Sequence, residues 1–273
     1  NAKAIIFDID TFGGRVDAAT QIKDIILDSK VTTVAFINKR AISAGALISL
    51  SCDSIFMTPG ASIGAATAVD LKGNKASEKV ISYMREEMAS TAEANNRSRE
   101  IATSMVDEDL SIPYLLNLEG DTLTSKDVEG FSEGKLITLS THLAVQLGIS
   151  NKEIETYDDL LIHLNFADAE TIEVTETWSE VLVRFLTNPM VAPLFMSLGM
   201  LGLFMEIKSP GFGVPGIFGL LCLALFFGSH LLVGLADMTE MLILFAGIML
   251  ILLEILVIPG FGIAGISGIG LIF

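Results

Sequence analysis

The sequence predicts an α/β domain followed by an all-α transmembrane bundle, and three observations support this fold class. Up to about Thr187, short apolar runs alternate with amphipathic segments, as in βαβ units around a largely parallel sheet. Beyond Thr187 almost every residue is apolar, as expected of a chain in lipid. That part also contains an internal repeat built around Pro-Gly-Phe-Gly. We therefore predict a first domain over residues 1–165, a linker over 166–188 with a strand and an amphipathic helix, and a membrane domain over 189–273.

Each element of the first domain is predicted from its local pattern. Residues 4–10 form a short apolar run ending in acid, which is typical of a parallel strand buried on both faces. Residues 16–29 place isoleucines and alanine on one face of a helix. The other predicted elements are strands over 31–37, 54–57, 136–139 and 171–176, a helix beginning after Ser43, and helical segments over 80–105, 141–147 (stopped by Gly148) and 178–186.

The membrane domain is predicted to contain four apolar segments. The first three approach the roughly 20 residues that cross a bilayer. Each copy of the repeat ends a helix with a carboxylate, Glu206 or Glu254, and restarts with closely spaced glycines, which let helices approach in lipid. We therefore expect a packing role for the repeat rather than a transport pathway. The segments cover 191–207, 214–236, 241–258 and 263 onward.

Charge and cysteine content exclude some classes of protein. The net charge of −16 argues against a nucleic-acid partner, because nothing would neutralise the phosphates. Cys52 and Cys222 lie in different domains and are not expected to pair. We expect no cofactor and no metal. Because a strand begins within a few residues of Asn1 and Phe273 stops inside an apolar run, we also expect both ends to be truncated.

The clearest candidate for chemistry is Ser43, which stands between a predicted strand and a predicted helix. Ala44, Gly45 and Ala46 follow it, so nothing bulky covers its hydroxyl or the next backbone N–H groups. Nucleophilic serines need that geometry, because the following N–H helps to form an oxyanion hole. The alternative interpretation is that Ser43 only caps the helix.

Two glycine-containing segments accompany Ser43. Gly13-Gly14 follows the first strand, where it permits positive φ and close approach of a ligand to backbone N–H groups, or simply makes a tight turn. The small residues over 58–65 leave room for an extended peptide beside the chain, or make a tight loop. Neither pattern decides between binding and turn formation.

A serine nucleophile needs a base, and the histidines do not supply an obvious one. His142 and His163 lie in plain helical contexts and His230 lies in a membrane segment, so a Ser-His-Asp triad is poorly supported. A lysine is the other option, provided that burial depresses its pKa. The residues alone do not choose among the lysines.

Four motifs occur in an order that resembles a known family. They cover residues 10–19 (DTFGGRVDAA), 41–46 (AISAGA), 57–65 (MTPGASIGA) and 134–139 (GKLITL). Together they resemble the long form of the NfeD family, membrane-bound serine proteases with a ClpP-like (crotonase-type) domain related to signal peptide peptidase A. The Pro-Gly-Phe-Gly repeat is similar to the NfeD membrane region. The resemblance implies a ClpP/crotonase-like spiral of ββα units followed by the transmembrane bundle.

The resemblance also implies a site with a Ser–Lys dyad. The family's serine falls on Ser43, and its lysine falls on Lys79, which we expect to be desolvated between the domain and its substrate. One departure is Phe12, where the family usually has proline, and it concerns the rigidity of the oxyanion turn. The implied oxyanion-hole residues are Gly14 and Ala44, and the implied substrate-binding residues are Gly13, Ser62, Ile63 and Gly64.

Three functions follow as hypotheses. The first is a membrane-anchored endopeptidase that cleaves apolar segments of membrane-associated proteins such as stomatin-like proteins. The second is a non-proteolytic membrane scaffold or partner of a stomatin or flotillin assembly. The third is a crotonase-type acyl-CoA enzyme, for which no additional acidic pair is seen. The intact Ser43/Lys79 pair favours the first.

Cellular location and assembly are also predicted, from the residues and from the family resemblance. We expect a multi-pass protein of the cell membrane that contacts membrane lipid and forms a homo-oligomer. Lys208 follows the first membrane segment, which places that loop in the cytoplasm and the protease domain outside. The family resemblance further implies a small OB-like β-barrel after Phe273.

Overall fold

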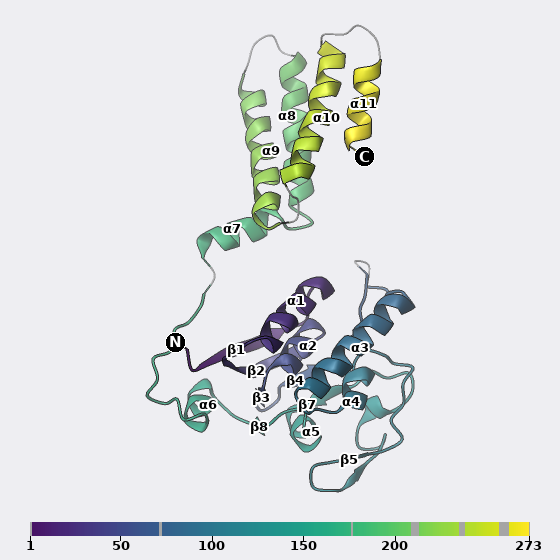
Figure 1. Cartoon of the computed structure of the whole chain (residues 1–273), viewed down its shortest axis with the longest axis vertical. Helices are drawn as coiled ribbons and strands as arrows, with labels where there is room; N and C mark the ends of the chain where they lie inside the picture. The colour runs from purple at the N-terminus through teal and green to yellow at the C-terminus, as the bar shows by residue number, and fades with distance from the viewer. Residues whose placement is uncertain are drawn as a thin grey trace. The chain divides into compact units, whose positions relative to one another are not determined.

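The computed structural model describes residues 2–70, 73–175, 177–208, 213–234, 238–256 and 262–272. The chain divides into two compact units, Asn1–Glu170 and Thr171–Phe273. The first unit is a mixed α/β domain and the second consists of helices (Figure 1). Each unit is described by itself.

The first unit is built on a six-stranded sheet whose central strand is β2, Thr32–Ile42. β2 pairs in parallel with β1 on one side, and with β3 and then β4 on the other. β8 extends the sheet in parallel beyond β3, whereas β7 pairs antiparallel with β4. The other strands are β1 Ala4–Thr11, β3 Ser54–Met57, β4 Ser62–Gly64, β7 Thr138–Ser140 and β8 Lys152–Glu153, and a separate hairpin joins β5 Leu115–Leu116 to β6 Thr122–Leu123.

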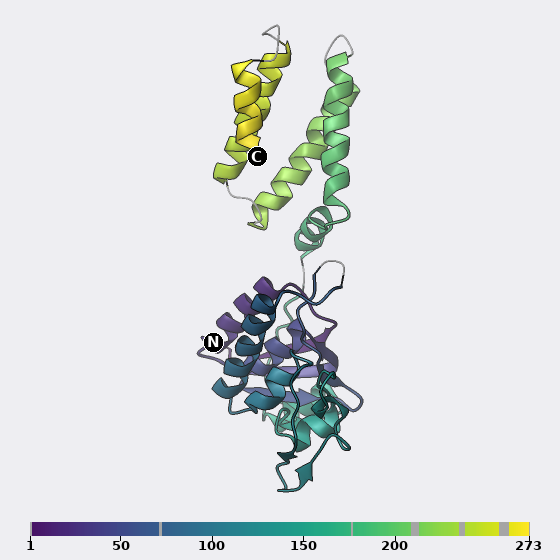
Figure 2. The ribbon, with the colours of Figure 1, turned by 90° about the vertical axis from the view of Figure 1, so that its right-hand side faces the viewer.

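Apolar side chains of β2 are buried on both faces of the sheet. Ala35, Ile37 and Ala41 belong to the main core with α1, α2 and α3, which form a layer of helices over one face (Figure 2). Val34 and Phe36 point the other way and pack with α6. The helices of this unit are α1 Val16–Leu27, α2 Ala44–Ser51, α3 Glu78–Ala94, α4 Arg99–Ser104, α5 Thr141–Gln146 and α6 Tyr157–His163, with a 3₁₀ turn at Glu129–Phe131.

Most of the elements predicted from local pattern are confirmed, including β1, α1, β3 and α5 with Gly148 at positive φ after it. The predicted helix over 80–105 is wrong, because the chain breaks into α3 and α4 at Asn96, whose φ is 57°. The predicted strand over 171–176 is also wrong for the described residues 171–175, which form no ladder. β4 was not predicted, since it has three residues next to a Pro-Gly turn.

The second unit begins with α7, Trp178–Leu186, followed by the longer helices α8 Ala192–Lys208, α9 Val214–Leu232, α10 Met238–Leu256 and α11 Ile263–Ile272. α8 packs on α9, and α10 packs on α11. Gly202 and Gly219 lie at the first contact, where a Cβ on either would meet the backbone of the other helix at less than 3.0 Å, so glycine permits this approach. Among the described residues, α9 is the helix whose length and hydropathy suit a bilayer crossing by themselves.

The repeated carboxylates cap the helix that follows them. Glu206 at the end of α8 accepts hydrogen bonds from the N–H groups of Gly213 and Gly216 at the start of α9. In the second copy, Glu254 accepts one from the N–H of Gly262 at the start of α11. The first N–H groups of a helix have no partner within the helix. The carboxylates therefore close both hairpins, which supports the packing role expected for the repeat.

Candidate active site

Ser43 lies at the sharp turn between β2 and α2, in a conformation that L-residues rarely adopt. Its φ is 56° and its ψ is −116°, values of the first central position of a type II′ turn, where glycine is favoured. Its side chain makes no capping hydrogen bond to α2, so the capping interpretation does not hold in this structure. The half-buried hydroxyl is left available for chemistry.

The turn after β1 lies directly against Ser43. Gly13 has φ +124°, and a Cβ built on it would meet Ser43 Cβ at 2.7 Å and Oγ at 3.1 Å. Thr11 fixes this turn, because its Oγ1 accepts a hydrogen bond from the Gly13 N–H at 3.0 Å. Gly14 is next to Ala44, whose Cβ would lie 3.9 Å from a Cβ on the glycine. The structure thus brings the predicted nucleophile and both predicted oxyanion-hole residues to one place.

The amides of Gly14 and Ala44 are free to bind a ligand. Among the described residues neither N–H has a hydrogen-bond acceptor, whereas the N–H groups of Ala46 and Leu47 in α2 donate to the Ser43 carbonyl. Both residues are partly or fully exposed. Open N–H groups beside a hydroxyl are the elements of an oxyanion hole.

Two further glycine contacts hold Ser43 in place, and sequence reasoning did not assign them this role. The Gly64 carbonyl accepts the Ser43 N–H at 3.0 Å, and a Cβ on Gly64 would collide with the backbone of Ile137. A Cβ on Gly45 would meet the Thr11 γ-methyl at 2.6 Å. Ser43 is therefore tied to the end of β4, and α2, which follows it, is pressed against the end of β1.

Phe12, the departure from the family pattern, makes a stacking contact with Arg40. Phe12 is 76% exposed, and the Arg40 guanidinium stacks over its ring at 4.4 Å from the centroid. Arg40 also pairs with Asp10 through Nε at 2.8 Å. Cation–π stacking of this kind contributes about 0.5–1 kcal/mol at exposed sites. It restrains the residue that stands where the family usually has proline.

The predicted substrate-binding residues Ser62, Ile63 and Gly64 lie in a strand that is internal to the sheet. Ser62, Ile63 and Gly64 form β4, which pairs with β2 on one edge and with β7 on the other. Ile63 is fully buried, whereas Ser62 is half-buried. The backbone of β4 is thus occupied on both sides, and contact with a substrate is left to side chains at its ends.

Lys79 is the second residue of α3, and its side chain is exposed. Within the described part of the chain it forms no ion pair and no hydrogen bond to Ser43. α3 itself packs against α2, the helix that begins at Ser43. The desolvation expected for Lys79 is therefore not present in the single chain without substrate.

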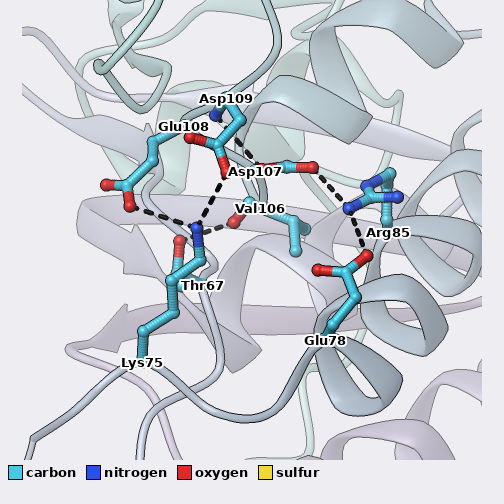
Figure 3. Close-up of polar contacts among 8 residues, drawn as sticks. All are labelled: Thr67, Lys75, Glu78, Arg85, Val106, Asp107, Glu108 and Asp109. Carbon is cyan, nitrogen blue, oxygen red and sulfur yellow. Dashed lines mark hydrogen bonds and ion pairs between the residues drawn. The ribbon is translucent and has the colours of Figure 1, made fainter.

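Charged residues around the start of α3 are paired in a way that distinguishes Lys79 from its neighbours. Figure 3 shows Arg85 between Glu78 and Asp107, and Lys75 between Glu108 and Asp109. The hydrogen bond to Glu108 raises the pKa of Lys75, which stays protonated and is unsuited to act as a base. Lys79 has none of these partners.

Buried Arg97 anchors the far end of α2. It donates hydrogen bonds to the carbonyls of Leu50 and Cys52 at 2.9 Å, and to those of Asp53 and Ile149 at longer distance. These carbonyls include the last ones of α2, which have no partner within the helix. The helix that carries Ser43 at its start is thereby fixed at both ends.

Residues 1–174 match the family model "NfeD1b, N-terminal domain", and residues 190–273 match "NfeD integral membrane domain". The chain is 40% identical over 272 residues to membrane protein NfeD1b of Bacillus subtilis, covering 100% of this chain and 59% of that protein. It is 28% identical over 233 residues to the membrane-bound protease PH1510 of Pyrococcus horikoshii, covering 82% of this chain and 50% of that protein.

Among solved structures, the chain is similar to a lysine-to-alanine mutant of the 1510-N membrane-bound stomatin-specific protease in complex with a substrate peptide. The TM-score is 0.50 at 22% identity, covering 68% of this chain and 84% of that one. At this identity the likeness supports the ClpP-like α/β fold alone. The chain spans about half the length of the curated relatives it matches. On the family models and the 40% identity, the chain belongs to the NfeD family and carries an NfeD integral membrane domain.

Proposed function

We propose that this chain is a membrane-anchored serine endopeptidase in which Ser43 is the nucleophile and Lys79 is the general base. The observation that carries the proposal is the backbone of Ser43, with φ 56° and ψ −116° at a strand-to-helix junction. Strained non-glycine residues of this kind cluster at active sites. The two open amides beside Ser43 support the same chemistry.

The proposed reaction is acyl transfer. The neutral amine of Lys79 takes the hydroxyl proton while Ser43 Oγ attacks the scissile carbonyl carbon. The resulting oxyanion accepts hydrogen bonds from Gly14 and Ala44, and its collapse expels the new amine, which takes the proton from Lys79. Water, activated by the same amine, then hydrolyses the acyl-enzyme. Because Lys79 is exposed in the single chain, bound substrate or a second copy supplies its desolvation.

We further propose that the substrate is an apolar segment of a stomatin-like membrane protein. Support comes from the description of the 1510-N relative as stomatin-specific and from the exposed Phe12 beside Gly13 and Ser43. A homo-oligomer, several membrane crossings and an extracytoplasmic protease domain belong to the same proposal. α8 to α11 and the integral membrane domain support the crossings.

Cleavage of apolar fluorogenic peptides by the full chain in detergent micelles tests the proposal. We expect Ser43→Ala and Lys79→Ala to abolish cleavage with the fold intact. Matched controls are Ser90→Ala on the exposed side of α3 and Lys75→Ala, whose ion pairs are exposed and screened by solvent. Retained cleavage in the Ser43→Ala or Lys79→Ala protein would remove that residue from the mechanism.

The exposed Lys79 favours one competing function, a non-proteolytic scaffold in a stomatin or flotillin assembly. A scaffold binds its partner equally well with or without the Ser43 hydroxyl and cleaves nothing. Co-purification of a stomatin-like protein in full-length form with the wild-type chain, together with no peptide cleavage, would establish the scaffold. Trapping of the partner by Ser43→Ala and its shortening by the wild type would establish the peptidase.

A further inference from the structure

α7 presents an apolar stripe that is left uncovered by the described residues of its own unit. Trp178, Val181, Leu182 and Phe185 lie at i, i+3, i+4 and i+7, so they share one face of the helix. All four are exposed, Trp178 at 79%. The start of α7 is well defined, because a capping box between Thr177 and Glu180 satisfies its first N–H groups.

The C-terminal end of α7 packs within the second unit. Leu186, which lies four residues after Leu182 at the edge of the same face, is buried, and α7 contacts α9. Within this unit α7 runs crosswise to α8–α11 in Figure 1 and is seen end-on in Figure 2. A helix that crosses a bilayer and a helix lying in its surface plane have this mutual orientation.

We propose that α7 is an interfacial helix whose stripe of Trp178, Val181, Leu182 and Phe185 is immersed in the headgroup–acyl boundary of the bilayer. The stripe ends five residues before residue 190, where the match to the integral membrane domain starts, and it carries the one tryptophan of the chain. Tryptophan favours that boundary because its ring is apolar and its N–H is polar.

The charges of α7 indicate which part of the lipid binds. Its charged residues are Glu180 and Arg184, and residues 171–177 before it add acidic groups without a cation. This segment therefore offers no electrostatic attraction to anionic headgroups. Binding is to the apolar boundary, and neither anionic lipid nor low salt is needed.

Fluorescence of Trp178 in the full chain, reconstituted in zwitterionic nanodiscs, tests this directly because no other tryptophan contributes. We expect blue-shifted emission, weak quenching by acrylamide, and quenching by lipids brominated near the top of the acyl chain that exceeds quenching by lipids brominated near its end. The quenching is expected to be the same at low and high salt. Val181→Glu is expected to remove most of the lipid quenching, while Ser179→Glu, off the stripe, leaves it unchanged.

Three results would overturn the proposal. Emission like that of free indole, together with strong acrylamide quenching, would show that the stripe is exposed to water. Blue-shifted emission without quenching by any brominated lipid would mean that protein, from this chain or a second copy, covers it. Quenching that vanishes with zwitterionic lipid or rising salt would assign the contact to anionic headgroups.

Discussion

Ser43 holds a side chain in a backbone conformation normally adopted by glycine, at φ 56° and ψ −116°. Such a conformation costs on the order of 1–3 kcal/mol. Three contacts maintain it, namely the Gly64 carbonyl on the Ser43 N–H, the Gly13 backbone against Cβ, and Thr11 packed over Gly45. The fold thus stabilises a strained residue whose hydroxyl has no structural use, which is the pattern expected of a nucleophile.

Replacing the serine separates strain from chemistry. Both Ser43→Ala and Ser43→Gly remove the hydroxyl, but only glycine relieves the strain. After the ~0.5–1 kcal/mol entropic disadvantage of glycine, we expect Ser43→Gly to be more stable than Ser43→Ala by about 1 kcal/mol. Thermal unfolding of the two full chains measures the difference. A glycine variant less stable than the alanine variant would show that the position is not strained.

Cys52 supplies a probe for that unfolding. Desolvation by burial raises the pKa of the Cys52 thiol from 9.0 to about 12, and the side chain is fully buried. Below pH 9 the thiol is neutral in both states, and as the pH rises toward 12 only the unfolded chain ionises, so stability is lost over that window. In a Cys222→Ser background at neutral pH, we expect a thiol reagent to modify Cys52 only on unfolding. Rapid modification of the native chain would contradict its burial.

Arg97 is the element-scale feature on which α2 and the break between α3 and α4 depend. Arg97 is 7% exposed and donates hydrogen bonds to backbone carbonyls in three parts of the chain. Asn95 at the end of α3 adds a hydrogen bond to the Leu50 carbonyl at 2.8 Å, and Ser98 caps α4. The turn between α3 and α4 therefore positions Arg97 at the end of α2.

Replacing this arginine leaves buried acceptors without a donor. Each such group costs about 1–3 kcal/mol, so we expect Arg97→Met to lower the free energy of unfolding by about 3 kcal/mol or more. Arg99→Met is the matched control, because Arg99 pairs with Glu86 and Glu93 at the surface, where solvent screens both ion pairs, so its loss is expected to lower stability much less than the loss of Arg97. Both are measured by Cys52 exposure under heating. Equal losses would contradict the anchoring role.

The sequence predicted elements well where local periodicity alone decides them. β1, α1 and β3 follow from runs of apolar residues, and α7 follows from its amphipathic stripe. β4 and the break at Asn96 depend on partners far along the chain, β7 in one case and the carbonyl of Leu50 in the other. Local pattern contains no information about such partners.

The candidate site was predictable to a similar extent. The order of the motifs identified Ser43, Gly14 and Ala44 as candidate site residues, and the structure places them together. The strain at Ser43 and the contact of Gly64 with its amide required the sheet to be assembled. The exposure of Lys79 was not predicted. The family resemblance implies a base that is desolvated when substrate is bound, whereas the structure is that of a single chain without substrate.

At the scale of the whole molecule, a serine-bearing α/β unit is joined to an integral membrane domain through an amphipathic helix. Two repeated hairpins, each closed by a buried or half-buried carboxylate, build that domain. The proposed peptidase would therefore be attached to the membrane that holds its proposed substrates.

Site-specific labelling by a fluorophosphonate tests the central claim most directly. The full chain in detergent is incubated with the reagent, and the adduct is located by mass spectrometry of its peptides. We predict an adduct on Ser43 in the wild type and in Lys75→Ala, and none in Lys79→Ala. No adduct on wild-type Ser43, or an equal adduct without Lys79, would contradict a Ser43–Lys79 peptidase.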